Sequence, residues 1–350
     1  MTTAQPVAAS ARAGAVRGLL PGYFALVMST GMVSIGLNLH DWHAASVVLL
    51  WLSVVCFVIL LVATVLRFLR FRAELVGDLS NPERAFGFFT IVAAIDVVGT
   101  RLVIDGHNHL AGALLAAALV VWLVLGYVIP VVAVLGRRER PVINHTNGTW
   151  FIWAVASQSV TVLAATLQPT GVPGTNLLAL IAVFSWSLGV FLYAVVGILL
   201  IVRLTVYPFG PQDIQPPYWV AMGATAITVL AGSRIVAMEQ APTVDVTRGL
   251  VAGLALLFWC FGTWLIPALL AIGWWRHITH HIPIRYEPAW WSLVFPVAMY
   301  GVGSHYLGVA DHLPIVTSVG DVVIWVAVAV WALTFVAMLA HLWRSLVASQ

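Results

Sequence analysis

Residues 21–36 are PGYFALVMSTGMVSIG, in which a Pro-Gly pair and two aromatic side chains open a long apolar run. Four further apolar runs open in the same way, with a Gly or Pro followed within two residues by an aromatic pair. The pairs recur every 62 to 72 residues, beginning at Tyr23, Phe88, Trp150, Tyr218 and Trp290. This spacing indicates a repeated unit, and each unit is long enough to cross a membrane twice.

The composition indicates an integral membrane protein, because 61% of the 350 residues are apolar and only 8% are charged. Such a chain has too little polar surface to cover a water-soluble fold. Each repeat holds two apolar runs of about 20 residues, the length a helix needs to cross the hydrocarbon core. We therefore expect an all-α membrane protein of ten transmembrane helices, arranged as five tandem hairpins. The helices are expected near residues 19–39, 44–69, 84–105, 110–135, 149–168, 176–203, 217–238, 248–275, 289–309 and 316–345.

This organisation leaves one membrane domain, residues 19–345, between short tails at residues 1–18 and 346–350. All 16 basic residues are Arg, and all but Arg101, Arg234 and Arg248 lie at the termini or between an even helix and the next odd one. The positive-inside rule then places both termini in the cytoplasm, in a multi-pass protein of the plasma (inner) membrane. Five units of the same orientation are not an inverted repeat; they predict five copies around an axis perpendicular to the membrane.

Two of the exceptional arginines, Arg101 and Arg234, lie near the outer ends of predicted odd helices. If these helices surround a passage, both guanidinium groups attract anions to its outer mouth, because arginine keeps its charge. The alternative is that each side chain simply extends to the membrane interface.

Aligning the odd helices on their aromatic pairs places one large ring, Phe295, level with four smaller residues. Those residues are Met28, Ala93, Val155 and Gly223. If the side chains at this level face the axis, Phe295 alone could close the passage. Pro296 would bend the helix and set the angle of the Phe295 ring. The alternative is a packed core Phe beside a structural kink.

The level three residues further along contains Asp96, the acidic residue in the middle of a predicted helix. A carboxylate inside a membrane usually faces a cavity, a partner or a proton path. Alternatively, Asp96 pairs with Thr100 and only holds helices together. His305 is a second candidate for proton-linked transport. The other residues expected to line the passage at this level are Gly31, Gln158, Ala226 and Ala298.

The strings PGYFALVMSTGMVSIG, NGTWFIWAVASQSV (147–160) and PAWWSLVFPVAMYGVG (288–303) resemble the first, fifth and ninth helices of one transporter family. This is the tellurite-resistance/dicarboxylate transporter family, which includes the plant slow-type anion channels. The resemblance implies an inner ring of five odd helices around a pore, an outer ring of even helices, and commonly a homotrimer. It also implies that a Phe on the ninth helix occludes the pore, and the match in FPVAM makes Phe295 its counterpart.

Two functions follow from the residues and the resemblance. One is a passive channel for small anions, gated at Phe295. The other is a proton-coupled carrier or exporter of C4-dicarboxylates such as malate, of sulfite or of tellurite-type oxyanions, in which Asp96 or His305 exchanges a proton. The expected partners are these inorganic or carboxylate anions and the lipid bilayer. We expect no enzyme activity, cofactor, metal site or nucleic-acid partner.

Overall fold

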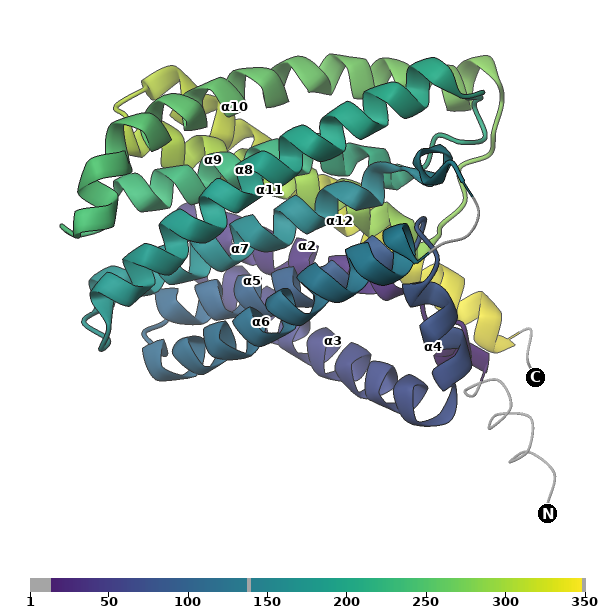
Figure 1. Cartoon of the computed structure of the whole chain (residues 1–350), viewed down its shortest axis with the longest axis horizontal. Helices are drawn as coiled ribbons and strands as arrows, with labels where there is room; N and C mark the ends of the chain where they lie inside the picture. Colours follow the sequence, from purple (N-terminus) through teal and green to yellow (C-terminus); the bar gives the residue numbers. More distant parts are fainter. Residues whose placement is uncertain (1–13, 137–139, 348–350) are drawn as a thin grey trace.

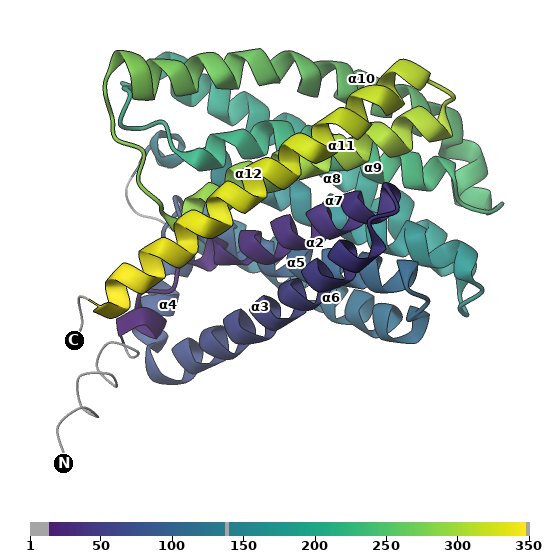
Figure 2. The same ribbon diagram turned by 180° about the vertical axis from the view of Figure 1, so that it is seen from behind.

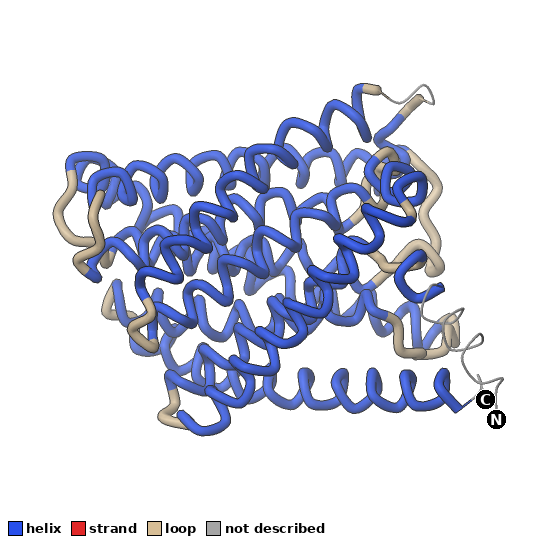
Figure 3. The backbone as a smooth tube through the Cα atoms, turned by 90° about the horizontal axis from the view of Figure 1, so that it is seen from below, coloured by secondary structure: helices blue, strands red, loops and turns tan. Residues whose placement is uncertain are grey.

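The computed structural model describes residues 14–136 and 140–347, and within these ranges its regular elements are all helical (Figure 3). Ten segments are long and apolar enough to span a membrane, which confirms the expected all-α fold with ten transmembrane helices. Parts of both expected tails, and Arg12, Arg137 and Arg138, lie outside the described residues. The helices are α2 (Ala25–Leu39), α3 (His43–Arg70), α4 (Arg72–Leu79), α5 (Thr90–Ile104), α6 (Asn108–Ile129), α7 (Phe151–Leu167), α8 (Thr175–Val206), α9 (Val220–Val236), α10 (Pro242–Trp274), α11 (Trp291–Ala310) and α12 (Pro314–Val347).

The ten spans form two layers, which we call the inner helices (α2, α5, α7, α9 and α11) and the outer helices (α3, α6, α8, α10 and α12). In the most apolar window of each inner span, 67 to 94% of the residues are buried inside the protein, compared with 17 to 28% in the outer spans. Helix α2 contacts α5, and the contacts continue through α7, α9 and α11 back to α2. The outer helices lie around this closed cycle (Figures 1 and 2), so their apolar side chains are left to face lipid.

Each aromatic pair marked in the sequence lies at a tight 3₁₀ turn that leads directly into an inner helix. Neighbouring turns contact one another around the whole cycle. A Cβ atom at Gly148 would overlap the carbonyl group of Pro217 in the next turn, so only glycine permits this close approach. The turns are Pro21–Phe24, Ala85–Phe89, Gly148–Trp150, Pro216–Trp219 and Pro288–Trp290.

All inner helices begin at the end of the bundle where α12 finishes, which we call the termini end; the opposite end is the far end (Figure 2). The short helix α4, which the hydropathy pattern did not predict, lies at the termini end. Its buried Asp78 accepts hydrogen bonds from Arg67 at 2.6 Å and from Arg84 at 3.1 Å. These ion pairs fix α4 against α3 and against the start of the second inner span.

The predicted helix boundaries differ most at the start of the eighth span, which begins at Pro242 and not near residue 248. Proline is favoured in the first turn of a helix because its missing N–H has no partner there and its backbone is already helical. The polar residues Asp245 and Arg248 therefore lie inside the first turns of α10.

Candidate functional site

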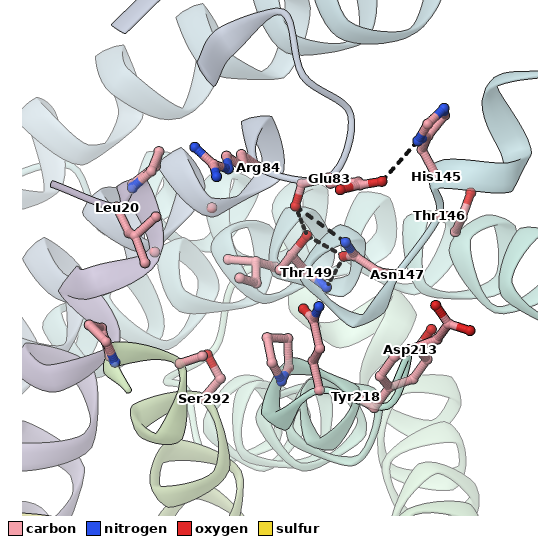
Figure 4. Close-up of a pocket in the computed structure, with 18 of the residues that line it drawn as sticks. Leu20, Glu83, Arg84, His145, Thr146, Asn147, Thr149, Asp213, Tyr218 and Ser292 are labelled. Atoms are coloured by element: carbon pink, nitrogen blue, oxygen red, sulfur yellow. Dashed lines mark hydrogen bonds and ion pairs between the residues drawn. The ribbon is translucent and has the colours of Figure 1, made fainter. Parts of the chain in front are cut away.

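A polar cavity of about 380 Å³, here called the vestibule, opens at the termini end of the bundle (Figure 4). All five inner segments contribute to its wall, through Tyr23, Gly87, Thr149, Tyr218 and Ser292. The connecting loops add charged and polar side chains. These are Glu83, Arg84, Asn144, His145, Asn147, Asp213 and Gln215, and Arg203 from the last turn of α8 joins them.

Several of the charged groups of the vestibule are held in place by short contacts. His145 Nδ1 lies 2.9 Å from a carboxylate oxygen of Glu83 (Figure 4). The guanidinium of Arg203 donates to two backbone carbonyl groups, those of Asn144 at 2.7 Å and Pro208 at 2.9 Å. Because carbonyl groups do not neutralise it, Arg203 keeps a full positive charge beside the vestibule.

A second, smaller cavity, here called the chamber, lies between the same five helices toward the far end. Two aligned positions from every inner helix line it, nine and twelve residues after the first aromatic of each repeat. The first set is Met32, Val97, Ser159, Ile227 and Met299, and the second is Ile35, Thr100, Val162, Leu230 and Val302. The chamber is completed by Asp96, Arg234 and Tyr306.

Phe295 lies between the two cavities along α11. Ser292, three residues earlier, lines the vestibule, and Met299, four residues later, lines the chamber. Residues at these spacings share one face of a helix. Phe295 is only 2% exposed and lines neither cavity, so its ring is buried at a level between the vestibule and the chamber.

The residues aligned with Phe295 are also buried, and they form what we call the constriction level: Met28, Ala93, Val155, Gly223 and Phe295. Gly223 allows a close approach of α9 to α11, because a Cβ atom there would lie 2.8 Å from Cγ of Pro296. The Pro296 ring therefore packs against α9, the neighbouring inner helix, at Gly223.

Asp96 is fully enclosed, and its carboxyl group reaches across to α7. Ser159 Oγ lies 2.9 Å from Asp96 Oδ2, whereas Asp96 Oδ1 has no hydrogen-bond partner among the described residues. Thr100 Oγ1 is likewise buried and unpartnered, so the expected alternative of an Asp96–Thr100 pair does not appear as a hydrogen bond.

Arg234 lines the chamber near its far end, with its guanidinium 3.9 Å from the centre of the Tyr306 ring. Its Nε atom is buried and has no hydrogen-bond partner among the described residues. The aromatic face stabilises the cation without neutralising it, and the charge remains available to an anion in the chamber.

The structure places Arg101 elsewhere than the outer mouth. Its side chain is fully buried between α2, α3 and α5, where it donates to Ser34 Oγ at 3.1 Å and to Ser46 Oγ at 3.0 Å. It also pairs with Asp105 at 2.5 Å. The neighbouring carboxylate of Asp105 compensates the charge of Arg101, and Arg101 is not among the residues that line the chamber. Its role is therefore to link helices.

The remaining expected residues have different surroundings. The Gln158 amide donates to the Trp186 carbonyl of the outer helix α8 at 3.2 Å, which turns it away from the chamber. A Cβ atom at Gly31 would meet Val97 on α5, so Gly31 serves helix packing. Ala226 and Ala298 are buried but do not line the chamber.

His305 lies next to the chamber-lining Tyr306 but points toward α12. Its Nδ1 atom is 2.7 Å from Asp321 Oδ1, and His40 Nε2 lies 3.8 Å from the same carboxylate. His305 thus belongs to a polar cluster with Asp321 and His40 between α11, α12 and the end of α2, and it is not among the residues that line the chamber.

A polar vestibule and a mostly apolar chamber lie between the same five inner helices, inside ten membrane-spanning helices, and this arrangement is typical of a multi-pass membrane protein of the transporter and channel class. The sequence comparison agrees, because the family model described as "Voltage-dependent anion channel" (SLAC1) matches residues 18–339. The chain belongs to this family.

Relatives from two groups of organisms support this assignment. An uncharacterized membrane protein of Mycobacterium tuberculosis is 60% identical over 152 residues, which cover 43% of this chain and 77% of that protein. An uncharacterized transporter of Methanocaldococcus jannaschii is 25% identical over 328 residues, 92% of each chain. A second uncharacterized transporter of that archaeon is 22% identical over 328 residues.

Proposed function

We propose that small anions cross the membrane along the axis of the inner helices, and that Phe295 closes this route at the constriction level. The observation that carries the proposal is the order of vestibule, Phe295 and chamber along one set of five helices. A side chain that is buried between two cavities is placed to act as a hydrophobic gate.

The charges along this route favour anions. Arg203 beside the vestibule and Arg234 in the chamber have no carboxylate partner among the described residues. Fixed positive charge at the walls of a narrow route raises the local concentration of anions. Two acids, Glu83 and Asp213, also line the vestibule, and His145 Nδ1 lies 2.9 Å from the Glu83 carboxylate (Figure 4).

Replacing Phe295→Ala tests the gate directly. We expect chloride conductance in a planar bilayer to rise by about ten-fold or more, because the substitution removes the ring that separates the cavities. The matched control is Phe151→Ala on α7, whose buried ring lies 5.1 Å from Tyr193 on the outer helix α8. The control removes the same volume away from the axis and should leave conductance near that of the unmodified protein. Equal conductance in both variants would exclude the gate.

A second candidate function rests on Asp96, which lines the chamber and has one carboxyl oxygen without a partner among the described residues. In a proton-coupled carrier of malate, sulfite or tellurite-type oxyanions, Asp96 exchanges a proton in each cycle. Asp96→Asn should then abolish uptake driven by a pH gradient in proteoliposomes. Under the channel proposal, Asp96→Asn leaves passive chloride flux through Phe295→Ala largely intact.

We also propose that the protein resides in the plasma membrane with the termini end in the cytoplasm, and that it assembles as a trimer with one route per subunit. The basic residues support the orientation, because Arg67, Arg84, Arg203, Arg276 and Arg285 belong to the termini end. The trimer follows from the family resemblance. Mass photometry of the detergent-solubilised protein would test it.

A further inference from the structure

Three residues that line the chamber each have a buried polar atom without a hydrogen-bond partner among the described residues: Asp96 Oδ1, Thr100 Oγ1 and Arg234 Nε. Buried polar atoms are nearly always partnered, and an unpartnered one costs free energy. The three atoms come from α5 and α9, and their side chains line one small cavity. Their common location indicates a binding site whose ligand supplies the missing hydrogen bonds.

Thr100 is unusual among the hydroxyl residues of the inner helices. Hydroxyl groups inside helices commonly donate to the carbonyl group four residues earlier, and Thr30, Thr166 and Thr228 do so at 2.6 to 2.8 Å. Thr100 makes no such bond, although it is only 3% exposed. Its hydroxyl therefore remains free to donate to a ligand or to accept from one.

Asp96 Oδ1 is a hydrogen-bond acceptor when the carboxyl group is ionised, and also when the carboxyl proton lies on Oδ2. Ser159 Oγ lies 2.9 Å both from Asp96 Oδ2 and from the Ala156 carbonyl, yet a hydroxyl has one proton to donate. Either Ser159 donates to an ionised Oδ2, or a protonated Oδ2 donates to Ser159. In both arrangements Oδ1 keeps free lone pairs and can accept from a donor, whereas a proton on Oδ1 itself would make this atom a donor.

We propose that the chamber binds a small oxyanion that carries its own O–H group. An anionic oxygen of the ligand accepts from Arg234 Nε, and the ligand hydroxyl donates to Asp96 Oδ1. The Thr100 hydroxyl makes a third hydrogen bond to the ligand. This inference rests on the proposed anion route, for which it names the substrate class. The free volume of the chamber is about 10 Å³, enough for about one water molecule, so the proposal requires both a ligand of few heavy atoms and a wider chamber in the bound state.

Halides and fully deprotonated oxyanions fit this site less well. They accept hydrogen bonds from Arg234 and Thr100 but have no proton to donate, and they leave Asp96 Oδ1 unpartnered beside a negative charge. A site built around a ligand hydroxyl discriminates against analogues that lack it, because its own polar atom stays unpaired. We expect such anions to bind about ten-fold more weakly or worse.

Bicarbonate and nitrate provide a matched pair of probes, because both are planar monovalent anions of three oxygens and only bicarbonate carries an O–H group. The test measures the melting temperature of the purified full-length protein in detergent, with each sodium salt titrated at one mildly alkaline pH and constant ionic strength. A bound ligand raises the melting temperature according to its concentration and affinity. Nitrate should need about ten-fold more salt than bicarbonate for the same rise.

Two variants of Asp96 separate the acceptor from the charge. Asp96→Asn keeps a carbonyl oxygen as acceptor and should retain the preference for bicarbonate, whereas Asp96→Leu removes the acceptor and should abolish it. Thr100→Val provides an independent variant if Asp96→Leu does not fold, and it should weaken bicarbonate binding. Equal stabilisation by both salts in the unmodified protein, or an unchanged preference in Asp96→Leu, would overturn the inference.

The binding measurement is independent of conduction, so the two proposals fail separately. If bicarbonate binds selectively but Phe295→Ala conducts no anion, the site stands and the channel proposal fails. If Phe295→Ala conducts chloride, nitrate and bicarbonate alike and no selective binding is seen, the route stands and this inference fails.

Discussion

At the scale of single residues, the two arginines near the far end differ in what surrounds the guanidinium group. Arg101 is enclosed by Ser34, Ser46 and Asp105, whereas Arg234 lies against the ring of Tyr306 in the chamber. Both were expected to attract anions from their similar positions in the repeats. The difference lies in the neighbouring helices, which the alignment of one repeat on another does not include.

Removing each of these charges should therefore have a different effect. Arg101→Gln leaves Asp105 without its partner and should lower the free energy of unfolding by about 2–3 kcal/mol, below the value for a fully buried pair because Asp105 is partly exposed. Thermal unfolding in detergent would measure the loss. Anion selectivity in a Phe295→Ala background should be unchanged.

Arg234→Gln should instead reduce chloride conductance in the Phe295→Ala background, by about ten-fold, because it removes the fixed positive charge of the chamber. Its melting temperature should change less than that of Arg101→Gln. If Arg234→Gln melts earlier than Arg101→Gln and conducts normally, the roles assigned to the two arginines are wrong.

The levels of the inner helices were largely predictable from the sequence, but the direction of each side chain was not. Alignment on the aromatic pairs brings together residues that the structure also places together, such as Thr100 and Val162 in the chamber. We expected the Gln158 side chain to face the axis, but it lies against α8. A residue three positions away on a helix is turned by about 60°, so the rotation of each helix decides which level faces inward, and packing sets that rotation.

At the scale of elements, the 3₁₀ turns explain why the aromatic openings repeat. They form a ring of contacts around the vestibule, and Gly148 fits against the backbone of Pro217 with no room for a side chain. The sequence indicated the repeat through its Gly, Pro and aromatic residues. It did not indicate that neighbouring repeats touch at this point, because contact between distant segments has no periodic signal.

Gly148→Ala should disturb this ring, since the added methyl group would overlap backbone atoms that cannot rotate away. We expect the free energy of unfolding to fall by about 1–3 kcal/mol, measured by thermal unfolding. The control is Gly126→Ala in α6, where a Cβ atom meets nothing within 4 Å and alanine favours the helix by about 0.5–1 kcal/mol. A Gly148→Ala protein as stable as the control would show that the close approach is not needed.

At the scale of the whole molecule, the order of inner and outer helices follows from hydropathy. Every inner span is less apolar than every outer span, because the inner helices contact other helices and the outer helices face lipid. This contrast was a readable signal for the two layers. The vestibule was harder to predict, since residues such as Glu83, His145 and Asp213 come from loops that only the closed fold brings together.

The orientation of the whole molecule is tested by reporter fusions. Green fluorescent protein fused after residue 350 should fluoresce, because basic loops stay in the cytoplasm. Alkaline phosphatase inserted at Gly106, between α5 and α6, should be active because that turn lies at the far end. A dark C-terminal fusion together with an inactive insertion at Gly106 would indicate the reverse orientation.

The most direct measurement of the closed route is chloride conductance in planar bilayers across a size series at one position: Phe295→Trp, the unmodified protein, Phe295→Leu and Phe295→Ala. If the ring of Phe295 separates the vestibule from the chamber, conductance should increase steadily as the side chain becomes smaller, with Phe295→Ala the highest. Conductance that is independent of side-chain size across the four proteins would contradict a gate at Phe295.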